Sequence, residues 1–311
     1  MKKIITVLFT ALIFLSTNAI SKEKYNTIQG YPAGGGTDSS FQSFSNYITK
    51  ESGTVFDPNY IVGASGLVSM KHFFSSTDPN QLTWVGSGLS IGNFVIYKQP
   101  NYNLEDIRPV VLSMNTPLLF VKSPKSSKIN SFSELFEKGC NKRIVVSVSG
   151  LMHNFVGKIL QKTSSCTIVL SIYKGDSAPI TDILNGSVDI GILPLLTSQT
   201  IVEQKGKILA STASINDADW KQYVNFSKFV PGANIYLEYG LWASKKMSDE
   251  KYKSLIDTIK KEWSNKEKRD KKVILPIGYK AKELYGEDYE KFLKENVNDL
   301  KKLAIKLNIQ K

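Results

Sequence analysis

The feature that most constrains the fold is the regular alternation of strand-like and helix-like segments along the chain. Tyr25 to Tyr31 is predicted to form a first strand, and Val55 to Val62 and Leu82 to Val85 are predicted to form two more. Between the first two strands the apolar residues recur at helical spacing and form one face, which consists of Phe41, Phe44, Tyr47 and Ile48. This order favours an α/β architecture with mostly parallel sheets. It argues against a fibrous or disordered chain.

A second series of the same kind begins near residue 118. Pro117 interrupts two apolar runs, Val110 to Met114 and Leu118 to Val121, and we interpret the interruption as a crossing between two lobes. Asn216 to Asn234 has weak periodicity and is predicted to be irregular. Leu237 to Ala243 is predicted to be a strand, followed by two amphipathic helices. The apolar face of the last helix is predicted to comprise Leu284, Phe292, Leu293, Val297, Leu300, Leu303 and Leu307.

The first nineteen residues have the layout of a secretory signal peptide. Lys2 and Lys3 precede the apolar run Ile4 to Leu15, and small residues ending in Ala19 follow. The run is short for a bilayer span, although a retained N-terminal anchor is the alternative. Cleavage after Ala19 would leave 311 − 19 = 292 residues. We therefore expect an exported protein located in the periplasm.

The net charge of +12 comes from lysine rather than arginine. Of 40 Lys and Arg residues, only Arg108, Arg143 and Arg269 are arginine, against 28 Asp and Glu. Recognition of bases and phosphates favours arginine, so a nucleic-acid or polyanion binder is the weaker interpretation. We expect a solvated lysine-rich surface and no nucleic-acid partner.

The two cysteines are too few for a disulfide framework or a four-ligand zinc site. Cys140 and Cys166 each stand just before a strand-like run, residues 144–148 and 167–173. If those runs are neighbouring parallel strands, both cysteines lie at the same sheet edge, within bridging distance. A single disulfide and two buried free thiols both remain open.

Three turns rich in small residues join strands to helices. They are Gly30 to Asp38, Gly63 to Gly66, and Ser147 to Met152. Such turns present backbone N–H groups at a helix N-terminus, where an anion is favoured. In open α/β sheets, ligands collect at the carboxyl ends of strands, which is where these turns lie. The alternative is that they are only tight connections, with Thr37 or Asp38 serving as a helix N-cap.

Enzymatic motifs are scarce. His72 lies in a helical pattern and is expected to be a packing or surface residue, whereas His153 follows the third turn. A nucleophile pair of Ser149 and His153 would make an exported hydrolase, but this spacing is common by chance. No phosphate-binding or dinucleotide motif accompanies the first turn. We expect no enzymatic activity, no metal and no cofactor.

The motifs occur in the order that is seen in the Bug/TctC family, the extracytoplasmic solute receptors of tripartite tricarboxylate transporters, which this chain resembles. Members of that family begin with a strand, which a Pro-x-Gly-Gly-x-x-Asp loop joins to a helix, and residues 31–38 match this loop. The further matching segments are residues 62–66, 78–84, 173–179, 184–189 and 239–243. The resemblance as a whole extends from residue 24 to the end of the chain.

The resemblance implies a type II periplasmic binding protein fold, with two lobes that each contain a mostly parallel sheet and a ligand cleft between them. It assigns residues 20–107 and 226–311 to lobe 1 and residues 108–225 to lobe 2. The implied ligand is a small organic anion with a carboxylate. The implied partners are membrane transporter subunits, and the receptor itself is expected to be a monomer. A receptor of the same fold that acts in signalling is the alternative.

The resemblance also implies which residues bind the ligand. In the first lobe they are Pro32, Ala33, Gly34, Gly35, Gly36, Thr37, Asp38, Ser65, Gly66 and Ser87. In the second lobe they are Ser149, Gly150, Met152, Tyr173, Asp176 and Ser177. The carboxylate would be received by backbone N–H groups of Gly34 to Thr37, directly or through water. Leu151 and Met152 depart from the family pattern and predict either a more apolar wall or a shorter loop, with a correspondingly different ligand.

Overall fold

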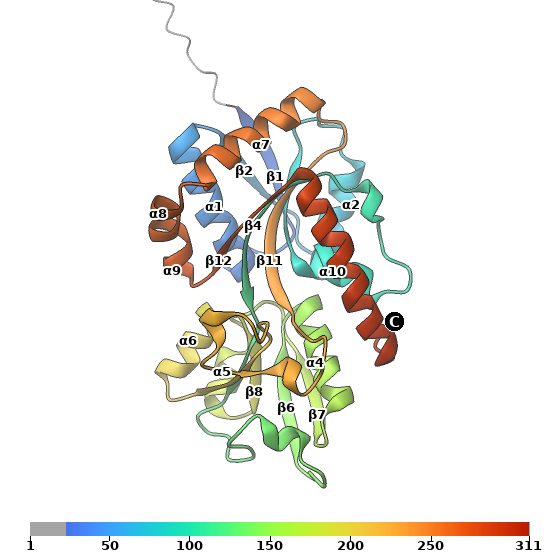
Figure 1. The fold of residues 1–311 in the computed structure, drawn as a ribbon, viewed down its shortest axis with the longest axis vertical. Coiled ribbons are helices and arrows are strands. Elements are labelled where there is room, and N and C mark those ends of the chain that lie inside the picture. The colour runs from blue at the N-terminus through green and yellow to red at the C-terminus, as the bar shows by residue number, and fades with distance from the viewer. Residues whose placement is uncertain (1–22, 311) are drawn as a thin grey trace, which may run out of the picture.

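The computed structural model describes residues 23–310 and contains two stacked lobes (Figure 1). Each lobe is built around a six-stranded sheet that is flanked by helices. The predicted signal peptide, residues 1–19, lies outside the described residues. Within residues 23–310 no helix is both long and apolar enough to cross a membrane.

The first sheet has the strand order β12-β4-β11-β3-β1-β2. β2 and β3 pair with β1 in parallel, whereas β11 and β12 run antiparallel to their neighbours. The strands span Lys24–Gln29 (β1), Val55–Tyr60 (β2), Leu82–Gly86 (β3), Pro109–Pro117 (β4), Tyr236–Ala243 (β11) and Lys280–Tyr285 (β12). The long strands β4 and β11 lead from this sheet towards the second lobe (Figure 1).

The second sheet has the strand order β10-β9-β5-β8-β6-β7. β6 pairs in parallel with both β7 and β8, and β5 is antiparallel to β8 and β9. The strands span Leu119–Lys122 (β5), Arg143–Val148 (β6), Thr167–Ile172 (β7), Ile190–Leu193 (β8), Lys207–Ser211 (β9) and Val224–Asn225 (β10). The α/β class predicted from the sequence is confirmed.

Helices cover both sheets, with α1, α2, α7 and α10 around the first and α4, α5 and α6 around the second (Figure 1). A π-helical turn, Gly88–Gly92 (η2), follows β3 and leads into α3. The helices span Gly36–Ser52 (α1), Leu67–Ser75 (α2), Asn93–Ile96 (α3), Leu151–Thr163 (α4), Ile180–Asn185 (α5), Leu195–Glu203 (α6), Asp249–Trp263 (α7), Lys266–Arg269 (α8), Leu275–Ile277 (α9) and Gly286–Lys306 (α10).

An aromatic cluster fixes α1 and α7 on the first sheet. The ring of Phe44 lies 5.0 Å, between centroids, from each of the rings of Trp84 and Trp263. All three side chains are fully buried, and the indole N–H of Trp263 donates to the backbone oxygens of Ser113 and Lys282. Burying such a ring contributes about 1.5–3 kcal/mol. The helical face predicted around Phe44 is therefore the face that packs on the sheet.

The chain changes sheets at the predicted interruption, because β4 ends at Pro117 in the first sheet and β5 starts at Leu119 in the second. The division into lobes at residue 107 stays a prediction. It assigned β4 to the second lobe, however, and this strand lies in the first sheet. Sheet order is set by long-range pairing with β11, for which the sequence gives no local signal.

The prediction for the last helix was wrong at its start. Leu284 belongs to β12, and α10 begins only at Gly286, whose φ of +48° breaks the strand. β12 is an edge strand with the sequence Lys-Ala-Lys-Glu-Leu-Tyr and an irregular register against β4. Charged, half-exposed residues of this kind also occur on solvated helices. The sequence pattern therefore placed Leu284 in the last helix instead of in an edge strand.

A disulfide joins Cys140 to Cys166, so the two alternatives left open by the sequence are resolved in favour of a bridge. β6 and β7 pair in parallel with Arg143 opposite Thr167, which brings the residues before each strand together. The two Cα atoms are 4.8 Å apart. The bridge thus links the segments that precede β6 and β7.

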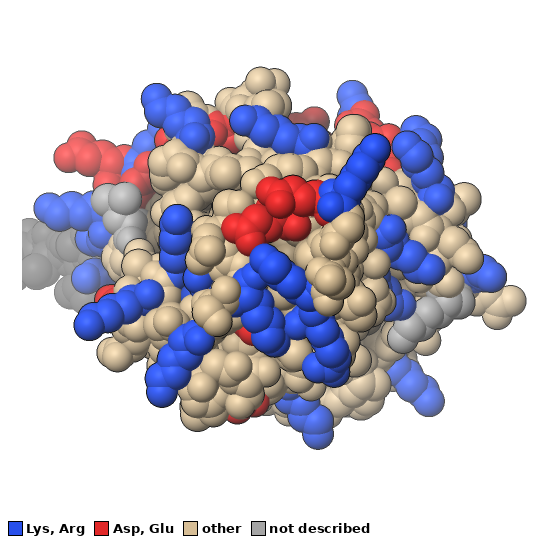
Figure 2. Space-filling view, turned by 90° about the horizontal axis from the view of Figure 1, so that it is seen from below, with Lys and Arg blue, Asp and Glu red and all other residues tan. Residues whose placement is uncertain are grey.

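Lysine and arginine side chains are distributed over the face of the second lobe that is seen from below, with a small acidic group between them (Figure 2). On this face the cations do not form one continuous stripe. The distribution agrees with the solvated lysine-rich surface that the composition predicts.

Candidate functional site

A cleft of about 540 Å³ lies where the turns of both lobes meet. The turns that follow β1, β3, β6 and β7 all contribute, so the cleft lies at the carboxyl ends of parallel strands. The predicted residues that line it are Pro32, Gly35, Gly36, Thr37, Ser65, Gly66, Ser87, Ser149, Gly150, Met152, Tyr173 and Asp176. Residues that the prediction did not include also line it, among them Tyr31, Leu151, His153, Lys174, Leu237 and Tyr239.

Three helices begin at the cleft without a side-chain cap. Their N-cap residues are Gly35 for α1, Gly66 for α2 and Gly150 for α4, and none of them has a side-chain cap hydrogen bond. The suggestion that Thr37 or Asp38 caps α1 is therefore wrong. By contrast, α7 is capped by the Ser248 hydroxyl, which accepts from the backbone N–H of Lys251. The first N–H groups of α1 and α4 are thus left for a ligand or water.

Asp38 does not line the cleft, although it was predicted to bind the ligand. Its carboxylate is buried and accepts from the backbone N–H of Gly34 at 2.8 Å and from the Tyr60 hydroxyl at 2.7 Å. Gly34, which has a φ of +82°, and Ala33 lie outside the lining as well. Asp38 therefore holds the loop before α1 in place, because its carboxylate lies in the first turn of that helix and accepts from the backbone of the loop.

The second turn is held in an unusual backbone conformation. Gly63, Ala64, Ser65 and Gly66 all have positive φ values, of 152°, 45°, 55° and 90°. For Ala64 and Ser65 this left-handed region costs about 1–2 kcal/mol each. The Tyr31 hydroxyl donates to the carbonyl oxygen of Ser65 at 3.1 Å and ties the first turn to the second. Strain of this kind is commonly stored at ligand-binding sites.

Asp176 is the principal charged group inside the cleft. Its side chain is only 13% exposed, and Oδ1 accepts from the Ser149 hydroxyl at 2.5 Å. Nε2 of His153 lies 3.1 Å from the same oxygen, although the ring N–H is not aligned for a hydrogen bond. Burial raises the pKa of Asp176, but His153 and the Ser149 hydrogen bond outweigh it and hold the pKa below its usual value. Asp176 is therefore ionised at neutral pH.

The Asp176 carboxylate also reaches the first lobe. A Cβ atom placed on Gly36 would lie 3.0 Å from Oδ2 of Asp176, 3.6 Å from the Tyr279 hydroxyl and 3.9 Å from the Tyr239 hydroxyl. The rings of Tyr239 and Tyr279 are stacked with centroids 5.3 Å apart. Burial raises the pKa of both tyrosines and of Tyr31, and the charge of Asp176 raises it further. All three phenols therefore keep their protons at neutral pH.

Several predicted side chains at the cleft are already bonded to the protein. The Ser87 hydroxyl donates to the carbonyl of Tyr236 and accepts from the N–H of Glu238, which attaches η2 to β11. The Tyr173 hydroxyl donates to Asp182 at 2.7 Å. Ser177 is exposed and lies outside the lining. The polar groups that these residues offer a ligand are correspondingly few.

Leu151 and Met152 form an apolar contact between the lobes. A Cβ atom on Gly92 of η2 would lie 3.2 Å from the Leu151 Cβ and 3.3 Å from the Met152 sulfur. Both side chains are buried. The apolar wall that the sequence predicts here is therefore also a surface on which the two lobes close.

The hydrogen bonds around Ser149 do not fit the hydrolase alternative. The Ser149 hydroxyl donates to Oδ1 of Asp176 and not to His153, and Nε2 of His153 lies 3.1 Å from the same oxygen. A serine nucleophile needs an imidazole that accepts its proton. Here the Ser149 proton is directed to Asp176 and not to the imidazole, so the geometry does not activate Ser149.

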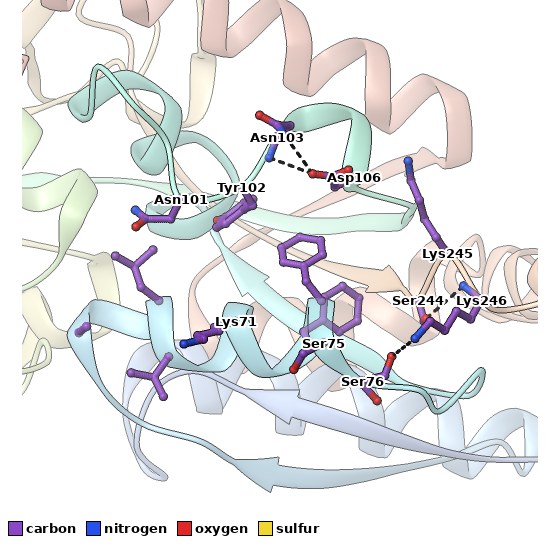
Figure 3. A pocket seen from close by; sticks show the side chains of 15 residues that line it. Lys71, Ser75, Ser76, Asn101, Tyr102, Asn103, Asp106, Ser244, Lys245 and Lys246 are labelled. Carbon is purple, nitrogen blue, oxygen red and sulfur yellow. Dashed lines mark hydrogen bonds between the residues drawn. The ribbon is translucent and has the colours of Figure 1, made fainter.

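A second, larger pocket of about 930 Å³ lies along α2, outside the cleft (Figure 3). Its polar groups are largely paired with one another. Lys246 donates to the carbonyl oxygen of Ser76 at 2.6 Å, Lys245 donates to that of Glu105, and Asn103 pairs with Asp106. This pocket contains none of the predicted ligand-binding residues. We therefore take the cleft as the candidate site.

Comparison with known proteins identifies the fold. No family model and no curated protein sequence matches the chain. A protein of R. palustris solved with adipate superimposes with a TM-score of 0.80 at 18% identity, over 93% of this chain and 99% of that one. The periplasmic binding protein BugD gives 0.77 at 20%, with the same coverage. MatC from Rhodopseudomonas palustris with bound malate gives 0.70 at 15%, over 91% of this chain and 99% of that one. The chain therefore has the two-lobed periplasmic binding protein fold of the Bug and TctC solute-binding proteins, as its motifs predicted.

Proposed function

We propose that this chain is a periplasmic solute-binding protein that captures a small carboxylated solute in the cleft. In this proposal it delivers the solute to the membrane subunits of a tripartite tricarboxylate-type transporter, and it acts by binding rather than by catalysis. The observation that carries the proposal is the pair of uncapped helices, α1 and α4, which begin on opposite sides of one cleft.

The physical support comes from the backbone of the two turns. The N-terminal N–H groups of a helix carry partial positive charge and favour an anion without any buried arginine. None of the lining residues of the cleft is arginine. Adipate and malate are the ligands in two structures with the same fold. Micromolar affinity requires about −8 kcal/mol, which a few charge-assisted hydrogen bonds and closure of the lobes can supply.

The proposal is tested by a thermal-shift screen of the mature protein with mono- and dicarboxylates and amino acids. A ligand that binds only the native state raises the melting temperature. Gly36→Val should abolish that response, because its side chain would enter the space between Gly36 and Asp176. Ala33→Val is the matched control, since Ala33 is exposed in the same turn and lies outside the lining.

Two results would contradict the proposal. One is the absence of a shift with every solute. The other is a shift that persists unchanged in Gly36→Val, which would place the binding site elsewhere, for example in the pocket along α2. Melting of each variant without solute shows whether it has folded.

A further inference from the structure

The electrostatics of the cleft are unusual for a site that receives only an anion. Its lining contains one acidic residue, Asp176, and one lysine, Lys174, which is exposed. Asp176 is ionised and largely buried, and Oδ1 takes the contacts from Ser149 and His153. Among the described residues no hydrogen bond reaches Oδ2, the oxygen that faces Gly36. The cleft thus contains the negative charge of Asp176, and Oδ2 of this carboxylate is left as a hydrogen-bond acceptor for a ligand.

The position of Asp176 also changes what the α1 N-terminus can do. Oδ2 lies close to Gly36, the first residue of that helix. The carboxylate of the protein therefore lies beside the region that the sequence analysis assigned to the ligand carboxylate. A second carboxylate at the same place would be repelled by Asp176, because like charges interact strongly where water is excluded.

Aromatic residues surround this carboxylate. Tyr31 and Tyr239 line the cleft, and the stacked Tyr279 brings its hydroxyl to the same place near Gly36. The hydroxyl oxygens of Tyr239 and Tyr279 have lone pairs that attract a cation, and the neighbouring carboxylate adds its charge to that attraction. A carboxylate among tyrosines is a combination that suits a cationic nitrogen, whether a primary ammonium or a quaternary one.

Building on the proposed function, we propose that the solute is zwitterionic, with a cationic nitrogen that contacts Asp176 and the tyrosines around it. Its carboxylate is received on the other side of the cleft, at the uncapped N-terminus of α4, with Lys174 at the rim. His153 is nine-tenths buried, and its Nε2 has no hydrogen-bond partner among the described residues. Because Nε2 lies 3.1 Å from Oδ1 of Asp176 without an aligned hydrogen bond, it can donate to the solute instead.

The inference is tested with pairs of solutes that differ only in the cationic group. Glycine betaine is matched by 3,3-dimethylbutyrate, in which carbon replaces the nitrogen, and aspartate and glutamate are matched by succinate and glutarate. Affinities are measured by titration calorimetry on the mature protein. We expect at least one zwitterion to bind tenfold or more tightly than its partner, which corresponds to about 1.4 kcal/mol.

Asp176→Asn supplies the second arm, because it keeps the shape of the side chain and removes its charge. We expect it to weaken binding of the zwitterion at least tenfold and to leave binding of the matched anion unchanged or stronger. Asp57→Asn is the control, since Asp57 is an exposed partner of Lys24 on β2, outside the cleft lining. Melting without solute confirms that each variant has folded.

The outcomes separate the inference from the proposed function. If succinate, glutarate or 3,3-dimethylbutyrate binds as well as its zwitterionic partner, the receptor function stands and the inference is overturned. The inference is also overturned if Asp176→Asn binds both members of a pair more tightly. Asp176 would then compete with the ligand for the protein instead of binding its cationic nitrogen. If no solute in either half of the panel binds, the proposed function is overturned and the inference with it.

Discussion

Removing the disulfide should destabilise the protein by an amount that follows from its position in the chain. Cys140 and Cys166 are 26 residues apart and close a loop that contains β6 and α4. In the chain-entropy model, a loop of this length restricts the unfolded state by about 3.5 kcal/mol at 25 °C. We expect the free energy of unfolding of Cys140→Ser/Cys166→Ser to fall by about that amount, and its melting temperature by roughly 7 °C.

Urea unfolding of the exported protein, with and without dithiothreitol, measures this effect. The reductant should lower the unfolding midpoint of the wild type to that of the double variant and leave the double variant unchanged. Thiol titration in denaturant should find no free thiol before reduction and two after it. Free thiols in the unreduced protein, or equal midpoints for wild type and variant, would refute the reasoning.

Two further predictions concern buried carboxyl groups. Asp38→Ala should weaken solute binding and lower the free energy of unfolding by about 1–3 kcal/mol, because Gly34 and Tyr60 lose their acceptor. Asp57→Ala, which breaks the exposed pair with Lys24, should cost under about 1 kcal/mol, and equal losses in urea unfolding would count against the role given to Asp38. Burial raises the pKa of Glu238 to about 8, against an opposing effect of Lys282. The unfolded chain releases this proton near its ordinary pKa, so stability should fall as pH rises from about 4.5 to about 8, by on the order of 1.4 kcal/mol per pH unit. Glu238→Gln should remove this part of the slope, and identical pH profiles of melting would show that Glu238 does not titrate in this way.

Much of the fold was predictable because it rests on local patterns. Helical spacing around Phe44 and the strand-like runs of the βα series reflect burial on one face, which a sequence displays directly. The sequence analysis considered the parallel pairing of β6 and β7 only as a condition, and in the structure this pairing brings Cys140 to Cys166. β4 belongs to the first sheet because it pairs with β11, and β12 exists as a strand because it pairs with β4. Both pairings join distant parts of the chain, so no local sequence pattern predicts them.

The cleft was predictable as a set of turns but not as an electrostatic environment. Small residues such as Gly35, Gly36 and Gly150 predict a turn at a helix N-terminus, and all three line the cleft. Tyr239 and Tyr279 are separated by 40 positions and meet only through the fold. Asp38 and Asp176 look alike as predicted ligand contacts. Only their hydrogen bonds show that Asp38 holds its own loop while Asp176 faces the cleft.

The most direct test of the account is a crystal structure of the protein with the solute that stabilises it most. The account predicts electron density for that solute between the first turn of α1 and the first turn of α4, in contact with Gly36 and with Asp176 or Ser149. Density in the pocket along α2, or an empty cleft at a saturating solute concentration, would contradict it.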